Sequence, residues 1–255
     1  MRKILAFVGL IVNFNFLFAA TLRVPEDQPT LQSAIDAASP GDDIHLAPGR
    51  YCGAFLNKRL TIIGEGQAGA ASLKRNHHYS WIVRQEDGAV IMSCPDGPKH
   101  SVGFSVGLWL SSPQASGSVL SNLGFDGVGI SNENLYPLAL AIYARDLSNG
   151  NNKINDIEIN QVHITGVVQG ITNNGGDGWN IHHNTIKDLS VFDCVTGNKF
   201  CSGGVGVVLQ LWRGAVPQGQ ARSYPVNNSV AYNNIMGAVP DTLSAFSMAG
   251  ILALN

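Results

Sequence analysis

The chain has few charged residues: only 13% of its 255 residues are Asp, Glu, Lys or Arg, and the formal net charge is −2. A nucleic-acid-binding protein is expected to carry a basic patch, so this balance gives no electrostatic case for nucleic acid as a partner. The length allows one domain with a sizeable core, and nothing in the composition requires two. The 45% of apolar residues and the 29 Gly fit a chain with much buried β structure and many turns.

Metal-binding motifs are also lacking. The sequence has four Cys, no Cys-x-x-Cys pair, and no His at ligand spacing from any Cys. We therefore predict no metal site and no cofactor, which leaves disulfide formation as the remaining structural use of the cysteines.

The first 20 residues have the features of a signal peptide. Arg2 and Lys3 supply the positive start, Ile4 to Val12 the apolar run, and Ala19 and Ala20 the small residues at a cleavage site. An uncleaved membrane anchor is the alternative, but polar residues interrupt the run and leave it short of a full span. There is no Cys at the cleavage site, which argues against a bacterial lipoprotein. We expect residues 21–255 to be secreted or periplasmic, with no membrane association after cleavage.

An oxidising compartment allows disulfides to persist. Cys194 and Cys201 bracket a short loop, so a bridge between them would staple it. Cys52 and Cys94 then form the second predicted pair by elimination.

One short frame recurs along the chain: an apolar residue, two free positions, Asn, one free position and an apolar residue. Its copies are Ile157 to Val162, Ile181 to Ile186 and Val230 to Ile235, with a degraded copy at Val119 to Phe125. Asn160 and Asn184 lie 24 positions apart (184 − 160 = 24), and Asn233 follows after about two such periods. Repeats of about 20 to 50 residues indicate a solenoid.

A second frame, a small residue before a β-branched or aliphatic one, interleaves with the first, so each coil holds at least two strands. It occurs at Ala141 to Ala144, Gly170 to Asn173, Gly206 to Leu209 and Gly250 to Ala253. Strand runs of three to five residues cannot build a doubly wound fold, which needs ten-residue helices between strands. The predicted fold is all-β: a single-stranded right-handed parallel β-helix of about eight coils. The repeated Asn is expected to adopt the left-handed backbone of a tight corner and to form an amide ladder.

Residues 22–66 are expected to close the first coil. We predict a strand at Leu22 to Val24, an amphipathic capping helix at Pro29 to Ala38, a strand from Asp43, a turn at Pro48 to Tyr51, and a strand from Leu60. A solenoid needs such a cover because an open end exposes core and strand edges.

Three segments within this region resemble the N-terminal cap of the pectin-lyase-like superfamily of right-handed β-helix proteins: Gln28 to Asp42, Ala47 to Tyr51 and Thr61 to Gly66. They are similar in particular to the opening of pectin methylesterases. The match is strong over about 40 residues and extends loosely through the coils. It implies a fold more than an activity.

Enzymes of that class act on polysaccharides lying across the outside of the coils, so a site here would consist of polar side chains stacked from neighbouring coils. Alignment on the Asn places Glu158 beside His182 and His163 beside Lys187. Each pair offers an acid and a base, or a base and a cation, for hydrolysis or for β-elimination from a uronate. An ordinary solvated face with cross-strand pairs is the alternative.

Two further positions are predicted to contact substrate, Trp109 and Arg145. Alternation along Phe104 to Leu110 points Trp109 outward, where it serves as a sugar-stacking platform or is buried under a neighbouring loop. Asp177, in the loop Asn173 to Gly178, completes the candidate catalytic set; the alternative is a plain turn in which Asp177 binds backbone N–H groups.

The catalytic marks of the related enzymes are missing. The polygalacturonase Asp-Asp, Gly-His-Gly and Arg-Ile-Lys segments are not found, nor are the methylesterase and pectate lyase signatures. Two function classes therefore remain: a β-helix that binds glycans or serves as a surface or structural protein without catalysis, and a lyase or hydrolase acting on a uronate-containing polysaccharide.

The segment Gly250 to Asn255 opens a new coil, and no covering element follows it. We expect the chain to be either incomplete or closed by a partner, with self-association through this end. The alternative is that the inserts at Asp188 to Gly203 or Gly237 to Ala249 fold over it.

Overall fold

The computed structural model describes residues 19–66, 74–75, 81–82, 88–92, 94, 96–99, 105–127, 138–147, 152–189, 204–210, 225–237 and 250–254. The predicted signal peptide, apart from its last two residues, and the predicted Cys194–Cys201 bridge lie outside these residues. Among the helices of the described part, none has the length and apolar character needed to cross a bilayer.

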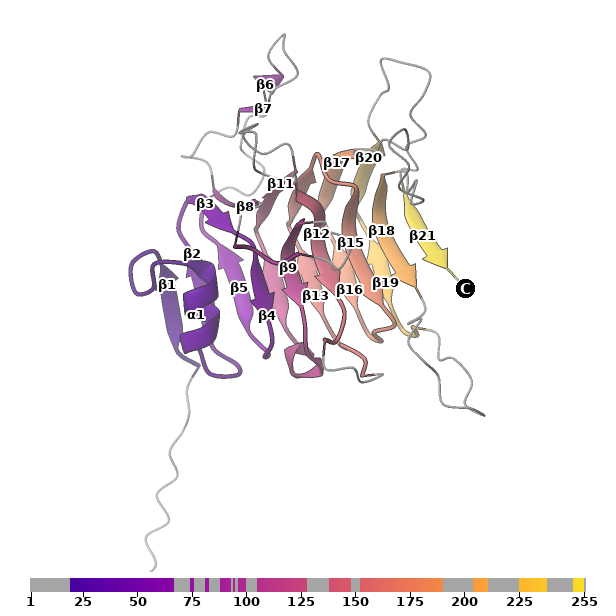
Figure 1. Ribbon diagram of the computed structural model, residues 1–255. Coiled ribbons are helices and arrows are strands. Elements are labelled where there is room, and N and C mark those ends of the chain that lie inside the picture. Colours follow the sequence, from indigo (N-terminus) through magenta and orange to yellow (C-terminus); the bar gives the residue numbers. More distant parts are fainter. Residues whose placement is uncertain are drawn as a thin grey trace, which may run out of the picture.

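Three parallel sheets form the molecule, and successive strands of each sheet come from successive coils (Figure 1). Sheet A contains, in spatial order, β1 (Thr21–Val24), β2 (Asp43–Leu46), β5 (Thr61–Gly64), β10 (Val119–Ser121), β13 (Glu158–Asn160), β16 (Asn180–His182) and β19 (Ser229–Ala231). Sheet B contains β3 (Gly49–Cys52), β8 (Ala89–Met92), β11 (Gly124–Asp126), β14 (His163–Thr165), β17 (Thr185–Leu189) and β20 (Asn234–Gly237). Sheet C contains β4 (Ala54–Leu56), β9 (Ser105–Leu110), β12 (Leu138–Ala144), β15 (Gln169–Asn174), β18 (Val205–Gln210) and β21 (Ile251–Leu254).

The chain visits the sheets in the order A, B, C and then returns to A, which is the arrangement of a parallel β-helix. A separate antiparallel pair, β6 (Lys74–Arg75) and β7 (Trp81–Ile82), interrupts the coil that begins with β5. The described strands make six coils of three strands after β1, so the prediction of about eight coils is wrong. A uniform period overestimates the number, because only some coils are compact: Glu158 pairs with Asn180, 22 positions later (180 − 158 = 22), whereas Asn180 pairs with Ser229, 49 positions later (229 − 180 = 49).

The bore is filled by the inward side chains of all three sheets. Most are fully buried, including Ile44, Ile62, Phe125, Ile164 and Ile171, whereas Val230 and Ile235 of the last coil are partly buried. Such side chains alternate with outward ones because successive residues of a strand point to opposite faces. This alternation matches the short apolar runs of the sequence.

A row of small residues runs along the inner side of sheet C, at Gly107, Ala141, Gly170, Gly206 and Gly250. A Cβ at Gly170 would lie 2.4 Å from the carbonyl oxygen of Gly206 and 3.2 Å from Ile186. The bulky inward residues of sheet B thus occupy the space that larger residues in this row would need. This is the physical basis of the small-residue frame in the sequence.

The corners between sheets A and B are made by residues with left-handed backbone. Asn122, Gln161, His183 and Tyr232, with φ of 54–55°, occupy equivalent positions in four coils. Among the repeated Asn residues, Asn122 has the predicted left-handed backbone, whereas Asn160, Asn184 and Asn233 do not, so the prediction is confirmed for the degraded copy of the frame and wrong for the other three. Asn160 ends a strand one residue before its corner, whereas Asn184 and Asn233 each follow one.

The amide ladder is confirmed for Asn184 and Asn233 and does not include Asn160. Asn184 Nδ2 donates to Asn233 Oδ1 over 2.9 Å, and Asn184 Oδ1 accepts from the Val162 backbone N–H over 2.8 Å. The side chain of Asn160 instead lies on the outer face of sheet A, where it contacts Ser121 and Glu158.

Helix α1 (Leu31–Ala37) is shorter than the predicted segment Pro29 to Ala38. Thr30 is its N-cap: Thr30 Oγ1 accepts from the Ser33 N–H, and Ser33 Oγ accepts from the Thr30 N–H, each over 3.1 Å. This reciprocal capping box makes Thr30 the N-terminal boundary of the helix, so Pro29 lies outside the helix. Leu31, Ala34 and Ile35 are buried, and the helix packs against β1, β2 and β4 (Figure 1). A 3₁₀ turn, η1 (Pro113–Ala115), precedes β10.

The predicted turn at Pro48 to Tyr51 is wrong, because the strand β3 already begins at Gly49.

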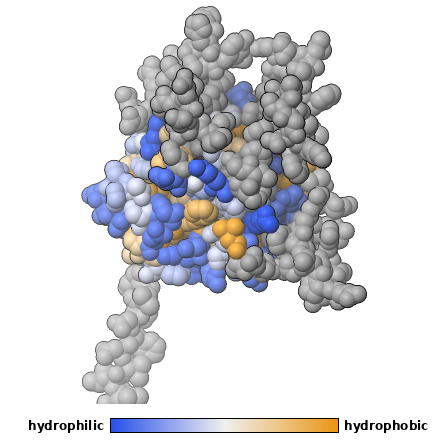
Figure 2. All heavy atoms as spheres, viewed as in Figure 1, coloured by the Kyte–Doolittle hydropathy of each residue, from blue (hydrophilic) through white to orange (hydrophobic). Residues whose placement is uncertain are grey.

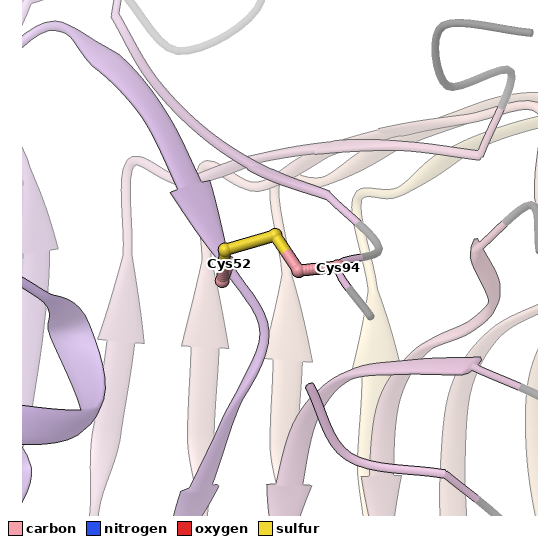
Figure 3. Close-up of a disulfide and its surroundings, with 2 residues drawn as sticks. All are labelled: Cys52 and Cys94. Atoms are coloured by element: carbon pink, nitrogen blue, oxygen red, sulfur yellow. A yellow bond between two sulfur atoms is a disulfide. The ribbon is translucent and has the colours of Figure 1, made fainter. Parts of the chain in front are cut away.

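Cys52, the last residue of β3, forms a disulfide with Cys94 just beyond β8 (Figure 3). The two strands are register neighbours, with Cys52 opposite Met92, and the two cysteine Cα atoms lie 5.4 Å apart. The pairing predicted by elimination is thus confirmed.

Candidate functional site

The five predicted catalytic residues lie in three different places. Glu158 and His182 are on the outer face of sheet A, and His163 and Lys187 are on the outer side of sheet B. Asp177 is in the turn between β15 and β16. The structure therefore brings together two pairs and does not bring all five into one site.

Polar side chains line the outer face of sheet A. One register row along this face contains Arg23, His45, Ile63, Ser121, Asn160, His182 and Ala231. Equivalent residues of neighbouring strands lie about 4.8 Å apart, so the row follows the solenoid axis. The described surface around β1 and α1 is mostly hydrophilic in Figure 2.

A cluster of three charged or titratable groups stands at the start of this row. Glu65 Oε1 accepts a hydrogen bond from Arg23 Nη1 over 2.8 Å and lies 3.3 Å from His45 Nδ1. The side chains are 27–50% exposed, so they remain accessible from solvent. The sequence pattern did not point to these residues, because they belong to the segment expected to close the first coil.

A second cluster lies further along the same row. Glu158 Oε1 is 3.5 Å from His182 Nε2 and accepts from Asn160 Nδ2 over 2.8 Å. Asn160 Oδ1 in turn accepts from Ser121 Oγ over 2.7 Å. The predicted proximity of Glu158 and His182 is therefore present.

The register between β13 and β16, which brings Glu158 and His182 together, differs from the predicted one. Asn160 is opposite His182, and Glu158 is opposite Asn180, so Glu158 and His182 are diagonal neighbours. At 3.5 Å the carboxylate and imidazole are within ion-pair reach but beyond a good hydrogen bond. A small side-chain movement would allow proton exchange between them or with a bound hydroxyl group.

Two rings extend this cluster around the corner to the next coil. His183 Nδ1 lies 2.8 Å from His182 Nδ1, and the His183 ring stacks on Tyr232 with centroids 5.2 Å apart. Tyr232 is 83% exposed. Neither His183 nor Tyr232 was singled out in the sequence, although the left-handed corner positions, once aligned, place them together.

The pair on sheet B has a different environment. His163 is opposite Thr185, and Lys187 is opposite Thr165, so His163 and Lys187 are again diagonal neighbours. His163 Nε2 is buried and has no hydrogen-bond partner among the described residues. Burial lowers the pKa of His163 to about 4, and the charge of Lys187 acts in the same direction while Asp188 opposes it. His163 is therefore a neutral imidazole at pH 7.

Asp177 makes structural contacts. Its Oδ1 accepts from the Val226 backbone N–H over 2.8 Å, and its Oδ2 lies 2.7 Å from Lys153 Nζ. These contacts match the alternative interpretation, a plain turn in which Asp177 binds backbone N–H groups, and they connect the turn to the next coil.

Trp109 points away from the bore, as predicted, but it is only 4% exposed. It belongs to a second apolar cluster outside the bore, where its ring lies 5.7 Å from Phe55 and 5.2 Å from Tyr143. Trp109 Nε1 donates to the Arg145 carbonyl oxygen over 3.0 Å. Burial raises the pKa of Tyr143, and nearby Arg145 opposes this shift. An exposed stacking surface at Trp109 is thus not present, because the outer face of sheet C is covered at this point.

Within the described ranges, no group of three or more His, Cys, Asp or Glu side chains is arranged to hold a metal ion. The fold and the polar row define a parallel β-helix with an accessible outer face on sheet A. Comparison with protein-family models, curated proteins and solved structures gives no match.

Proposed function

We propose that this protein is an exported right-handed parallel β-helix that binds glycans along the outer face of sheet A, without catalysis. The polar row on that face carries the proposal. Its polar side chains form two groups on either side of Ile63, Arg23 with His45 and Ser121 with Asn160 and His182. Within each group they come from neighbouring strands, so they repeat along the axis as the sugar residues of an extended chain do. Amide, hydroxyl, carboxylate and imidazole groups are the donors and acceptors that sugar hydroxyls require.

The fold and compartment support this function. The resemblance of residues 28–66 to the cap of pectin-lyase-like proteins favours a right-handed helix, with α1 as the cover of its first coil. The Cys52–Cys94 disulfide is typical of an oxidising compartment, and it agrees with export by the predicted signal peptide and with a second bridge between Cys194 and Cys201.

The test is binding of the exported protein to a panel of uronate, glucan and xylan polysaccharides. We expect retention on at least one of them, and a loss of affinity of about tenfold or more in His182→Ala and in Glu158→Gln. Glu26→Gln is the matched control. Like Glu158→Gln it removes one carboxylate, but from an exposed residue that follows β1. No binding to any polymer would contradict the proposal, and unchanged binding in both site variants would place the binding surface elsewhere.

A polysaccharide lyase or glycoside hydrolase is the second candidate. The 3.5 Å approach of Glu158 to His182 and the neutral His163 near Lys187 favour it, since each pair contains a group able to accept a proton. Incubation with uronate polysaccharides, followed at the ultraviolet absorbance of unsaturated products and by new reducing ends, distinguishes the two functions. Activity that survives His182→Ala combined with Lys187→Ala would keep the enzyme and exclude these residues as its catalytic groups.

We also propose that the protein self-associates through its last coil. β19, β20 and β21 stand at the same end of their three sheets. Four of the five exposed large hydrophobic side chains of the described residues belong to this coil: Val226, Tyr232, Met236 and Ile251. Exposed apolar groups beside strand edges favour association.

A further inference from the structure

The most exposed large hydrophobic side chain among the described residues is Tyr232, at 83%. It stands at a corner between sheets A and B with φ of 55°. Left-handed backbone is uncommon outside glycine, and Asn and Asp adopt it far more readily than a bulky aromatic residue does. Polar side chains occupy two equivalent corners instead: Gln161, two coils earlier, and Asn122, three coils earlier.

Tyr232 thus does little to stabilise the fold, because its side chain is not buried and its residue type does not favour the left-handed backbone. Strained positions of this kind persist where the residue has another role. One side of its ring is held by His183, at 5.2 Å between centroids and 21° between planes, so the ring has a defined orientation while most of its surface remains open. His183 is itself positioned by the 2.8 Å contact with His182.

We propose that Tyr232 and His183 form a stacking platform for a pyranose ring, and that the platform is one subsite of the glycan-binding face of sheet A. The proposal rests on the proposed function. A sugar ring has a face of C–H groups that packs on an aromatic ring, and hydroxyl groups around its edge that need hydrogen bonds. The platform and the polar row supply both in one place.

The polar groups adjacent to the platform belong to the cluster already described. His182 lies beside His183, and Glu158 lies 3.5 Å beyond His182, on the strand of the preceding coil. A sugar stacked on Tyr232 therefore has an imidazole and a carboxylate along the direction of the solenoid axis. Asn160 and Ser121 follow in the same row, two and three coils from Tyr232, where the later sugars of an extended chain would reach them.

This site differs from the sugar platform expected at Trp109. Trp109 is 4% exposed and packed between Phe55 and Tyr143. Tyr232 has an open ring, so the chemistry expected of the Trp occurs instead at the A–B corner.

Tyr232→Asn is the decisive variant, because Asn occupies the equivalent corner at Asn122 and is suited to the left-handed backbone. It removes the ring without disturbing the turn. Tyr232→Phe keeps the ring and removes only the hydroxyl group. Met236→Ala is the control, since it truncates another exposed apolar side chain of the same coil, one that is 45% exposed and has no ring.

The exported protein is titrated calorimetrically with hexasaccharides of β1,4-linked glucose, β1,4-linked xylose and α1,4-linked galacturonate, and each variant is also tested for melting temperature and sedimentation. We expect Tyr232→Asn to weaken binding about tenfold or more with an unchanged or raised melting temperature, while Tyr232→Phe and Met236→Ala bind as the unmodified chain does.

The contrary results are distinct. Wild-type affinity in Tyr232→Asn would overturn the platform and leave glycan binding on sheet A intact. A fall in melting temperature that accounts for the loss of binding would show that the ring supports the fold. A change in sedimentation with unchanged glycan affinity would assign the ring to contacts between copies of the chain. No binding of any hexasaccharide or polysaccharide by the unmodified protein would overturn both proposals.

Discussion

Asn184 and Asn233 lie one above the other in consecutive coils, and Asn184 Nδ2 donates to Asn233 Oδ1 over 2.9 Å. Asn184 is only 1% exposed, and its amide also bonds the Val162 N–H and the Ile159 carbonyl oxygen, over 2.8 and 2.9 Å. The side chain therefore satisfies buried backbone groups of the preceding coil, in addition to stacking on the next one.

Asn184→Ala should lower the free energy of unfolding by about 2–4 kcal/mol, because two buried backbone groups lose their partners. Chemical denaturation monitored by circular dichroism measures the change. Asn160→Ala is the control: Asn160 has the same place in the sequence frame but bonds only side chains on the outer face, so a cost below about 1 kcal/mol is expected. Equal costs would mean that the amide ladder adds nothing to stability.

The pKa of His163 predicts a dependence of stability on pH. The folded chain holds this pKa near 4, below the 6.5 of an unperturbed histidine, so the unfolded state binds more protons between these values. The stability associated with His163 is therefore present above about pH 6.5 and is lost as the pH falls toward 4, with a slope of up to about 1.4 kcal/mol per pH unit.

His163→Gln should flatten the profile of unfolding free energy over that window, and denaturant titrations at several pH values measure it. His182→Gln, which removes a more accessible histidine from sheet A, is the matched control and should leave the His163 contribution in place. An identical slope in the His163 variant would show that other groups cause the acid sensitivity.

Gly170→Ala should destabilise the protein by about 1–3 kcal/mol, because its Cβ would lie 2.4 Å from the Gly206 carbonyl oxygen in a packed interior. At Gly49, in contrast, an added Cβ would lie 3.5 Å from the Tyr51 hydroxyl, an ordinary contact. Gly49→Ala should thus change the midpoint of thermal unfolding far less. Comparable midpoints for the two variants would argue against close packing along the inner side of sheet C.

Trp109→Ala is expected to cost about 3–5 kcal/mol, the range typical of removing a large buried aromatic side chain. The loss should be seen as a lower melting temperature, with any loss of glycan binding explained by unfolding. If the variant instead kept its stability and lost binding, Trp109 would act as a sugar platform and not only as a member of the second apolar cluster.

Self-association through the last coil predicts a concentration-dependent sedimentation coefficient. Met236→Lys combined with Ile251→Lys should shift the protein toward the monomer, since these side chains are 45% and 53% exposed beside the strand edges. Leu147→Lys, at a hydrophobic side chain 51% exposed outside this coil, is the control and should not change the distribution. A monomer at high concentration in the unmodified chain would contradict the proposal.

The sequence by itself determined the class of fold. Short strand runs separated by Gly and Asn predict a solenoid of parallel strands, and the structure shows three parallel sheets. It also determined the small-residue row of sheet C and the strand that includes Trp109, because local alternation and composition are sufficient for these. The pairing of Cys52 with Cys94 was reached by elimination.

The register between coils was decided by the tertiary structure. Ile157 and Ile159 are both fully buried, and a slip of two residues keeps every side chain on its face, so the apolar pattern cannot distinguish one alignment from the other. The aligned Asn residues suggested that Asn160 matches Asn184. The left-handed corners at Gln161 and His183 show that Asn160 instead matches His182. The match of Asn184 with Asn233, which sets His183 against Tyr232, is the one that the sequence frame predicts.

Exposure was likewise decided only in three dimensions. Alternation predicts that Trp109 points away from the bore, but whether an outward side chain meets water depends on what covers that part of the sheet, and two-residue periodicity contains no information on this. Trp109 is buried and Tyr232 is open for that reason. The polar face of sheet A arises in the same way, since residues as distant in the chain as Arg23 and His182 join one row only when the coils stack.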